Sequence, residues 1–165
     1  MKRVEDKERL QTPTRQATLC FLLNDNNVLL GRKKRGFAEG KWNGFGGKRN
    51  DGEKISDTAI REFQEEAGIT PKLLVQVAVL DCYHPNWSQQ VVVYTTTEWD
   101  GTAAETEEME PKWFLVKDVP YEKMWDDETI WLPMVLEGKK LKARLQFNDK
   151  GKLFRQEITT VESFG

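Results

Sequence analysis

The apolar and polar positions of this chain alternate in short runs that predict strands on both sides of one central helix. Apolar and β-branched runs predict strands at residues 18–23, 28–30, 73–83, 89–97 and 112–116, and a terminal hairpin of residues 139–147 and 153–160. Helical patterns occupy residues 120–124 and 130–136, the second closed by Gly138. Strands around a mid-chain helix, with further helices late in the chain, predict an α+β sandwich.

The central helix is expected to begin near residue 56 and to end near residue 68. Ser56 is expected to cap its first turn, and Gly68 is expected to end it in a left-handed conformation. Ile60, Phe63 and Ala67 recur at i, i+3 and i+7, which predicts a narrow apolar stripe on one side.

The other side of this helix is acidic. Glu62, Glu65 and Glu66 stand at i, i+3 and i+4 and therefore share one face. Like charges at this spacing repel by roughly a few tenths of a kcal/mol, so the arrangement does not stabilise the helix. A divalent cation reverses the sign, and Mg²⁺ prefers a few carboxylates together with substrate phosphates. A solvated charge run is the alternative, but it explains neither the crowding of the glutamates nor the glycines at both ends.

Residues 36–52 hold half of the glycines of the chain and are predicted to form a loop, or a strand with close backbone approaches. Gly46 and Gly47 lie directly before the acidic helix and could offer a backbone carbonyl to a metal, because no Cβ blocks the approach. Basic residues cluster around this loop. Lys33 and Lys48 are the pair expected to neutralise phosphate charge.

Length and composition restrict the class of protein. The 165 residues fit a polar leader at residues 1–13 and a single domain at residues 14–165. A formal net charge of −2 argues against a nucleic-acid polymer as partner. No run approaches the roughly 20 apolar residues that span a bilayer, and residues 1–9 contain no apolar stretch typical of a signal peptide. A cytoplasmic monomer without a membrane partner is expected.

The cysteines and the histidine narrow the chemistry. Cys20 and Cys82 lie in apolar, strand-like contexts, which predicts buried free thiols, with a disulfide as the alternative. His84 is the single histidine, so a zinc site built from His and Cys would be short of ligands. It precedes Pro85 near a strand end and is interpreted as a loop or pocket residue that could contact a base or a ribose.

Residues 47–69 resemble the motif of the Nudix hydrolases, G-x5-E-x7-R-E-U-x-E-E-x-G-U, in which U is a bulky apolar residue. The residues at its specified positions are Gly47, Glu53, Arg61, Glu62, Phe63, Glu65, Glu66, Gly68 and Ile69. A likeness to the MutT-like oxidised-purine nucleoside triphosphatases extends from about residue 18 to residue 147. It includes residues 31–37, 42–48, 108–109, 113–114 and 124–133. The resemblance implies a Nudix-type α/β/α sandwich with a mixed β-sheet.

The resemblance also implies roles for the acidic residues. Glu62, Glu65 and Glu66 would hold Mg²⁺, or Mn²⁺ as a substitute, and Glu65 or Glu66 would border the attacking water. The Gly47 carbonyl would be a further metal ligand. Arg61 would hold its neighbouring carboxylates in place by charge-assisted hydrogen bonds.

Two carboxylates outside this trio have more than one interpretation. Glu53 is expected to pair with Arg61 or to tie down the loop, with direct metal binding as the alternative. Glu108 matches a late carboxylate that lies near the metals in this subgroup, whereas a solvated acidic loop is its alternative. Both are kept as candidates for the site.

The resemblance implies a pocket for the base formed by Phe37, Asn43, Trp125 and Asp127, with Glu128 as a second carboxylate. An Asp126–Asp127 pair is the alternative if the register differs by one. Cys82 and His84 stand where vertebrate relatives carry pocket phenylalanines, and Trp87 could compensate for the missing aromatic rings. Trp113 and Trp131 are assigned to the core.

The predicted activity is Mg²⁺-dependent hydrolysis of an oxidised purine nucleoside triphosphate, such as 8-oxo-dGTP, to the monophosphate and pyrophosphate. Its role would be sanitation of the nucleotide pool, and thereby DNA repair. One alternative is a Nudix diphosphatase that acts on ADP-ribose, a dinucleoside polyphosphate or a normal dNTP. The other is a nucleotide- or RNA-binding Nudix module without turnover.

Overall fold

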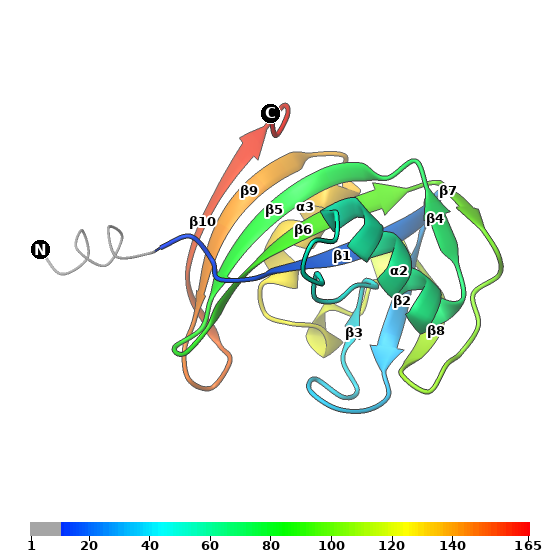
Figure 1. Cartoon of the computed structure of the whole chain (residues 1–165), viewed down its shortest axis with the longest axis horizontal. Helices are drawn as coiled ribbons and strands as arrows, with labels where there is room; N and C mark the ends of the chain where they lie inside the picture. Colours follow the sequence, from blue (N-terminus) through cyan, green and yellow to red (C-terminus); the bar gives the residue numbers. More distant parts are fainter. Residues whose placement is uncertain (1–10) are drawn as a thin grey trace, which may run out of the picture.

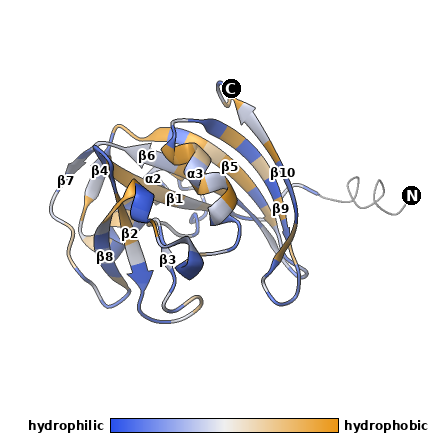
Figure 2. Ribbon diagram, turned by 180° about the vertical axis from the view of Figure 1, so that it is seen from behind, coloured by the Kyte–Doolittle hydropathy of each residue, from blue (hydrophilic) through white to orange (hydrophobic). Residues whose placement is uncertain are grey.

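The computed structural model describes residues 11–165, and it confirms an α/β/α arrangement around a mixed sheet. Figure 1 shows helix α2 (Ile55–Ala67) in front of the sheet, and Figure 2, seen from behind, shows helix α3 (Glu128–Leu136) on the opposite side. The polar leader expected at residues 1–13 falls largely on residues 1–10, which lie outside the described residues. Among residues 11–165, no helix is long and apolar enough to cross a membrane.

The large sheet combines parallel and antiparallel pairs. Its strands run in the order β10-β9-β5-β6-β1-β2-β3, and β8 pairs with the other edge of β2. The pairs β1–β6 and β5–β9 are parallel, whereas the others are antiparallel. The strands of this sheet are β1 (Gln16–Asn24), β2 (Asn27–Lys33), β3 (Trp42–Asn43), β5 (Val75–Tyr83), β6 (Ser88–Thr96), β8 (Met109–Leu115), β9 (Lys140–Phe147) and β10 (Leu153–Val161).

Each face of the sheet has its own apolar core. On the α2 side, Phe45 from the glycine-rich loop stacks on Phe63 of the helix, with ring centroids 4.4 Å apart. On the α3 side, Phe21 of β1 meets Trp131 edge to face at 6.2 Å. The α2 contact fixes the helix against the glycine-rich loop, which positions the acidic residues described below.

The start of α2 differs from its prediction. Lys54, not Ser56, is the N-cap residue, and no side chain caps the helix. Gly68 has φ +70° and ends the helix as expected. Phe63 and Ala67 are buried as predicted, whereas Ala59 takes the place of Ile60, since the buried apolar residues recur at i, i+4 and i+8.

Several other boundaries are corrected by backbone conformation. Leu73 has φ +51°, so β5 begins at Val75, and residues 120–124 contain only the short 3-10 helix η2 (Tyr121–Lys123). Trp131 is fully buried as predicted, whereas Trp113 is 36% exposed and was wrongly assigned to the core. Elements not predicted as such are the paired strands β4 (Thr70–Lys72) and β7 (Glu98–Asp100) and the 3-10 helix η1 (Val116–Asp118).

Candidate active site

The glycine-rich loop lies against strand β1 through backbone hydrogen bonds. Thr18 donates its N–H to the Gly47 carbonyl at 2.9 Å, and Cys20 and Phe45 exchange both of their backbone bonds. A Cβ on Gly46 would stand 1.7 Å from the Thr18 carbonyl oxygen. Only glycine therefore allows this loop to approach β1 so closely.

The same close approach brings the loop to two glutamates of α2. The Gly46 N–H donates to Oε1 of Glu66 at 2.9 Å. A Cβ on Gly47 would lie 2.5 Å from the carboxyl carbon of Glu62. The two glycines therefore provide the space in which Glu62 and Glu66 face the loop backbone.

Arg61 holds the acidic residues beside it, as the motif resemblance implies. Its guanidinium donates to Glu53 through Nε at 2.8 Å and Nη2 at 3.0 Å. Its Nη1 donates to Glu62 at 2.8 Å and more weakly to Glu65 at 3.4 Å, while Nη2 also reaches the Lys48 carbonyl at 3.1 Å. Arg61 therefore joins the loop and the helix.

Glu53 is occupied by these structural contacts. Besides Arg61, its carboxylate accepts hydrogen bonds from the Asn50 N–H at 3.1 Å and the Thr58 hydroxyl at 2.7 Å. These donors, Arg61 first, lower the pKa of the Glu53 carboxyl to about 2. Two of its predicted roles, the pair with Arg61 and the fastening of the loop, are confirmed as contacts.

Glu66 and Glu62 are carboxylates whose pKa is raised by burial. Glu66 is only 7% exposed, and burial raises its pKa to about 8. Glu62 and Glu108 add to this upward shift, while the Gly46 N–H and Lys33 oppose it. Burial also raises the pKa of Glu62, against the opposing effect of Arg61. A cation at this place would relieve both effects.

The donor set fits a hard divalent cation, although the side chains are not gathered into a metal site as they stand. Among residues 11–165, no three acidic, histidine or cysteine side chains converge on one point. Glu65 is largely exposed and contacts Arg61, and Glu108 faces Arg35 at 3.9 Å. The space beside Gly47, and the carboxylate oxygens of Glu62 and Glu66 directed toward the loop, are the features that suit Mg²⁺ or Mn²⁺.

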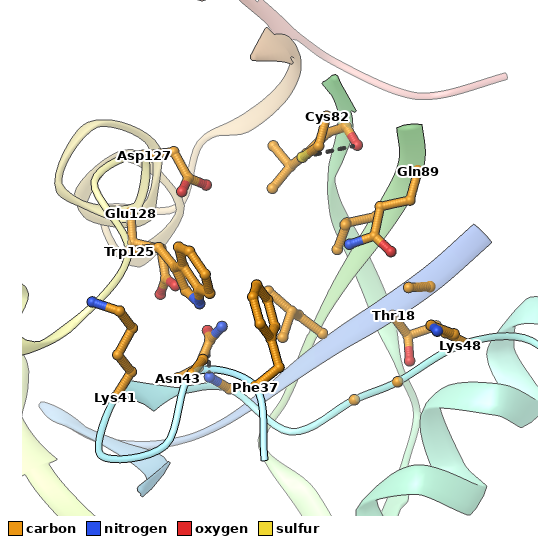
Figure 3. Close-up of a pocket in the computed structure, with 18 of the residues that line it drawn as sticks. Thr18, Phe37, Lys41, Asn43, Lys48, Cys82, Gln89, Trp125, Asp127 and Glu128 are labelled. Carbon is orange, nitrogen blue, oxygen red and sulfur yellow. Dashed lines mark hydrogen bonds between the residues drawn. The ribbon is translucent and has the colours of Figure 1, made fainter. Parts of the chain in front are cut away.

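A cavity of about 270 Å³ begins at this loop and extends under α3 (Figure 3). It brings together segments that are far apart in the sequence. The candidate residues that line it are Lys33, Phe37, Asn43, Gly47, Lys48, Glu66, Trp125, Asp127 and Glu128. The remaining candidates, Glu53, Arg61, Glu62, Glu65 and Glu108, do not line this cavity.

The mouth of the cavity is flanked by two aromatic rings. Phe37 is 70% exposed, and its ring centroid lies 5.4 Å from that of Trp125. The ammonium of Lys41 lies 5.3 Å from the Trp125 ring centroid. Oδ1 of Asn43 accepts the Gly44 N–H at 2.7 Å, so its amide NH₂ is the group left for a ligand.

A buried carboxyl pair lies deeper, on α3 and the residue before it. Asp127 accepts the indole N–H of Trp131 at 2.8 Å. Glu128 is 1% exposed, and its Oε2 has no hydrogen-bond partner among the described residues. Asp126 is exposed, and its nearest cation is Lys152 at 3.9 Å. The pair at the cavity is therefore Asp127–Glu128, whereas Asp126 does not line it.

Replacing Glu128 by glutamine is expected to stabilise the protein increasingly as the pH rises. Burial, followed by Asp127, raises the pKa of Glu128 well above its usual range. The unfolded chain therefore releases this proton first, so stability falls as the pH rises from the unfolded pKa, about 4.3, toward the folded pKa. Thermal unfolding across this pH range should show the melting temperatures of the unaltered protein and of Glu128→Gln diverging as the pH rises. A constant difference between the two melting temperatures would contradict a buried, proton-binding carboxyl. Asp126→Asn is the exposed control.

Some cavity residues were not chosen from the sequence. Lys41 was only one of a basic cluster, and Thr18 and Gln89 carry no motif signal, yet all three line the cavity. Thr18 Oγ1 is buried without a partner among the described residues. Cys82, His84 and Trp87 also line it, as their interpretation as pocket residues anticipated. Alternation along β6 could have indicated that Gln89 shares a face with the apolar Val91.

Fold and site together define a class of protein. The sequence model of the NUDIX domain matches residues 13–134, and the chain belongs to the Nudix hydrolase family. Hydrolases of this family generally use divalent metal ions.

Its relatives include two oxidized purine nucleoside triphosphate hydrolases. The one from Mus musculus is 37% identical over 153 residues, which cover 92% of this chain and 98% of that protein. The one from Danio rerio is 35% identical over 147 residues, which cover 88% and 94%. The crystal structure of a MutT protein from Bacillus halodurans has a TM-score of 0.77 at 24% identity, covering 87% of this chain and 97% of that one, and supports the fold.

Proposed function

We propose that this protein hydrolyses an oxidised purine nucleoside triphosphate, such as 8-oxo-dGTP, to the monophosphate and pyrophosphate in a Mg²⁺-dependent reaction. One observation carries the proposal. A single cavity joins a pair of rings and a buried carboxyl pair to the glycine loop and Glu66. A nucleotide in it would meet base-binding and phosphate-binding groups simultaneously. The similarity to the oxidized purine nucleoside triphosphate hydrolases of Mus musculus and Danio rerio supports this substrate class.

The acidic face supplies the chemistry. Glu62, Glu65 and Glu66 would hold the ion, with the Gly47 carbonyl and Glu108 as further ligands. The Gly47 oxygen already accepts one N–H and keeps a second lone pair for this purpose. When bound, Mg²⁺ neutralises phosphate charge and lowers the pKa of water.

The chain's own groups perform the remaining tasks. Glu65 or Glu66 accepts the proton of the water that attacks the phosphorus atom. Arg61 keeps Glu62 and Glu65 in place, and Glu53 keeps Arg61 in place. Lys33 and Lys48 pair with phosphate oxygens. The hydrogen bonds of Arg61 support its role and that of Glu53, and the positions of both lysines at the cavity support theirs.

The nucleoside is held at the other end of the cavity. Phe37 and Trp125 offer aromatic surfaces on which the base stacks. The Asn43 amide donates to an oxygen on its edge, and Asp127 and Glu128 meet donor groups of the base. An oxopurine offers both kinds of group.

A panel of nucleotides tests the proposal. We expect pyrophosphate release from 8-oxo-dGTP with a kcat/KM at least roughly tenfold above that for dGTP, since the polar edge of the base is read by buried groups. EDTA should abolish release, and added Mg²⁺ or Mn²⁺ should restore it. Equal rates for 8-oxo-dGTP and dGTP would refute the oxidised-purine preference. Faster turnover of ADP-ribose or a dinucleoside polyphosphate would indicate another Nudix diphosphatase, and binding without turnover would indicate a non-catalytic module.

The proposal extends to the cellular location, the oligomeric state and the cellular role of the protein. Cys20 and Cys82 are both buried and free, which suits a reducing compartment, so a cytoplasmic location is proposed. A monomer is proposed, with the nucleotide as partner and with neither a membrane nor a nucleic-acid polymer. Removal of oxidised nucleotides before their use by a polymerase would place the protein in nucleotide-pool sanitation.

A further inference from the structure

One wall of the cavity is polar and has no role in the site as described so far. It consists of Cys82 on β5, His84 just after β5, and Gln89 on β6, and it is called the polar wall below. Cys82 and Gln89 are direct partners across the two strands. Figure 3 shows these two side chains together, away from the carboxyl pair of α3.

His84 is held in a column of flat groups. Its imidazole stacks on the Trp87 ring at a centroid distance of 3.9 Å and an angle of 11°, and on the Phe147 ring at 4.6 Å and 5°. Two parallel rings at such distances fit only on opposite faces, so His84 is sandwiched between them. Its plane is fixed, and only its edge is left to meet a ligand.

Arg15 contacts both the Trp87 end of this column and Gln89. Its guanidinium lies 4.4 Å from the centroid of Trp87, on the outside of the column. Its Nε donates to Oε1 of Gln89 at 3.2 Å. Because the Gln89 oxygen is occupied by Arg15, the amide NH₂ is the end that remains for a ligand.

The side-chain nitrogen atoms of His84 and Gln89 are unused by the protein. Within residues 11–165, neither ring nitrogen of His84 nor the amide nitrogen of Gln89 has a hydrogen-bond partner. Burial and the charge of Arg15 lower the pKa of His84, which leaves the ring with one donor and one acceptor at neutral pH. Preorganised polar atoms on the wall of a mostly apolar cavity are typical of groups that select a ligand.

We propose that the polar wall is a hydrogen-bonding subsite for an oxygen of the nucleoside, bound by the Gln89 amide and the edge of His84. It deepens the proposed function and rests on it, because it takes a nucleotide as the occupant of the cavity. The oxygen is either the oxo group at C8 of the oxidised base or a hydroxyl of the sugar. Both accept a hydrogen bond from an amide NH₂, and the test below separates them.

Binding of nucleoside monophosphates in EDTA tests the subsite without turnover. The ligands are 8-oxo-dGMP, dGMP, GMP and 2′,3′-dideoxyguanosine monophosphate, each titrated by calorimetry. The variants are His84→Phe, which keeps the stacked ring and removes its nitrogens, and Gln89→Leu. We expect each variant to bind the nucleotide with the recognised oxygen roughly five- to tenfold more weakly. Binding of the nucleotide without that oxygen should stay within about twofold.

The pattern of losses identifies the oxygen. A loss confined to 8-oxo-dGMP assigns the subsite to the base. A loss for GMP, or for every nucleotide except the dideoxy form, assigns it to the sugar. An equal loss for all four nucleotides, or no loss for any, overturns the proposal.

Gln90→Leu is the matched control, because Gln90 is the next residue of β6 and faces the other side of the sheet. There its amide donates to Asp81 at 3.1 Å, and its oxygen accepts from Gln16 at 2.9 Å. It should leave all four affinities unchanged. Thermal unfolding checks the fold of each variant, and either His84→Phe or Gln89→Leu alone suffices if the other does not fold.

The test separates this subsite from the proposed activity. Selective binding without pyrophosphate release would overturn the hydrolysis and keep the subsite. Release of pyrophosphate from 8-oxo-dGTP with unselective losses in the variants would overturn only the subsite.

Discussion

Replacing Glu66 by glutamine is expected to lower kcat for nucleotide hydrolysis by roughly 100-fold or more. One carboxylate oxygen of Glu66 accepts the Gly46 N–H, so the other is the oxygen left for the ion or the attacking water. Glutamine keeps the shape but loses the charge and the ability to accept a proton. Pyrophosphate release measured over a metal titration should show the loss at saturating metal, with thermal unfolding showing a retained fold.

Two further variants make this result specific. Glu65→Gln is also expected to abolish turnover, and it tests the exposed member of the trio, whose only hydrogen-bonding partner among the described residues is Arg61. Asp57→Asn is the control, since it makes the same chemical change at an exposed position in the first turn of α2. Unchanged turnover in either glutamate variant would refute the role assigned to that residue.

The second large effect is expected from Gly46→Ala, which should destabilise the protein by about 3 kcal/mol and lower its melting temperature by on the order of 10 °C. The added Cβ would meet the Thr18 carbonyl oxygen at 1.7 Å and the carbonyl carbon at 2.5 Å. These are backbone atoms of a buried strand, so the loop must leave β1. Thermal and urea unfolding would measure the loss.

Gly47→Ala provides the comparison, because the atoms nearest to its new Cβ would be the far end of the Glu62 side chain. A flexible side chain moves more easily than backbone, so we expect a small change in melting temperature. Turnover should fall, since Glu62 is displaced from the loop. Equal destabilisation by both alanine variants would contradict this difference. It would show that the loop tolerates a side chain at neither position, whichever atoms the new Cβ meets.

The helix shows how far periodicity predicts a site. The spacing of Glu62, Glu65 and Glu66 was sufficient to place them on one face, and the structure confirms one helix containing all three. Periodicity treats the three as equivalent, whereas they differ in the fold. Glu66 is buried under Gly46, and Glu65 is exposed beside Arg61. The difference arises from the loop that lies over the helix, which no spacing within the helix encodes.

The boundaries that were predicted wrongly have a similar cause. Ser56 is a good capping residue by type, but Glu53 accepts a hydrogen bond from Thr58 and is tied to Arg61, which anchors the chain just before α2. The short strands β4 and β7 pair only with each other, and their apolar content is too small to produce a pattern. Local preference decided neither case, because contacts with distant residues outweighed it.

Local patterns determined the acidic helix, its end at Gly68, the glycine-rich loop before it and the terminal hairpin, because each depends on residues a few positions apart. The motif resemblance added the residues around the base. Only the folded chain showed that Asp127 and Glu128, rather than Asp126, lie at the cavity. It also brought Lys41, His84 and Gln89 together in that cavity. These groups come from β3, β5, β6 and α3 or the segments beside them. Only the packing of sheet and helix brings them to one cavity and sets which of their atoms remain unpaired.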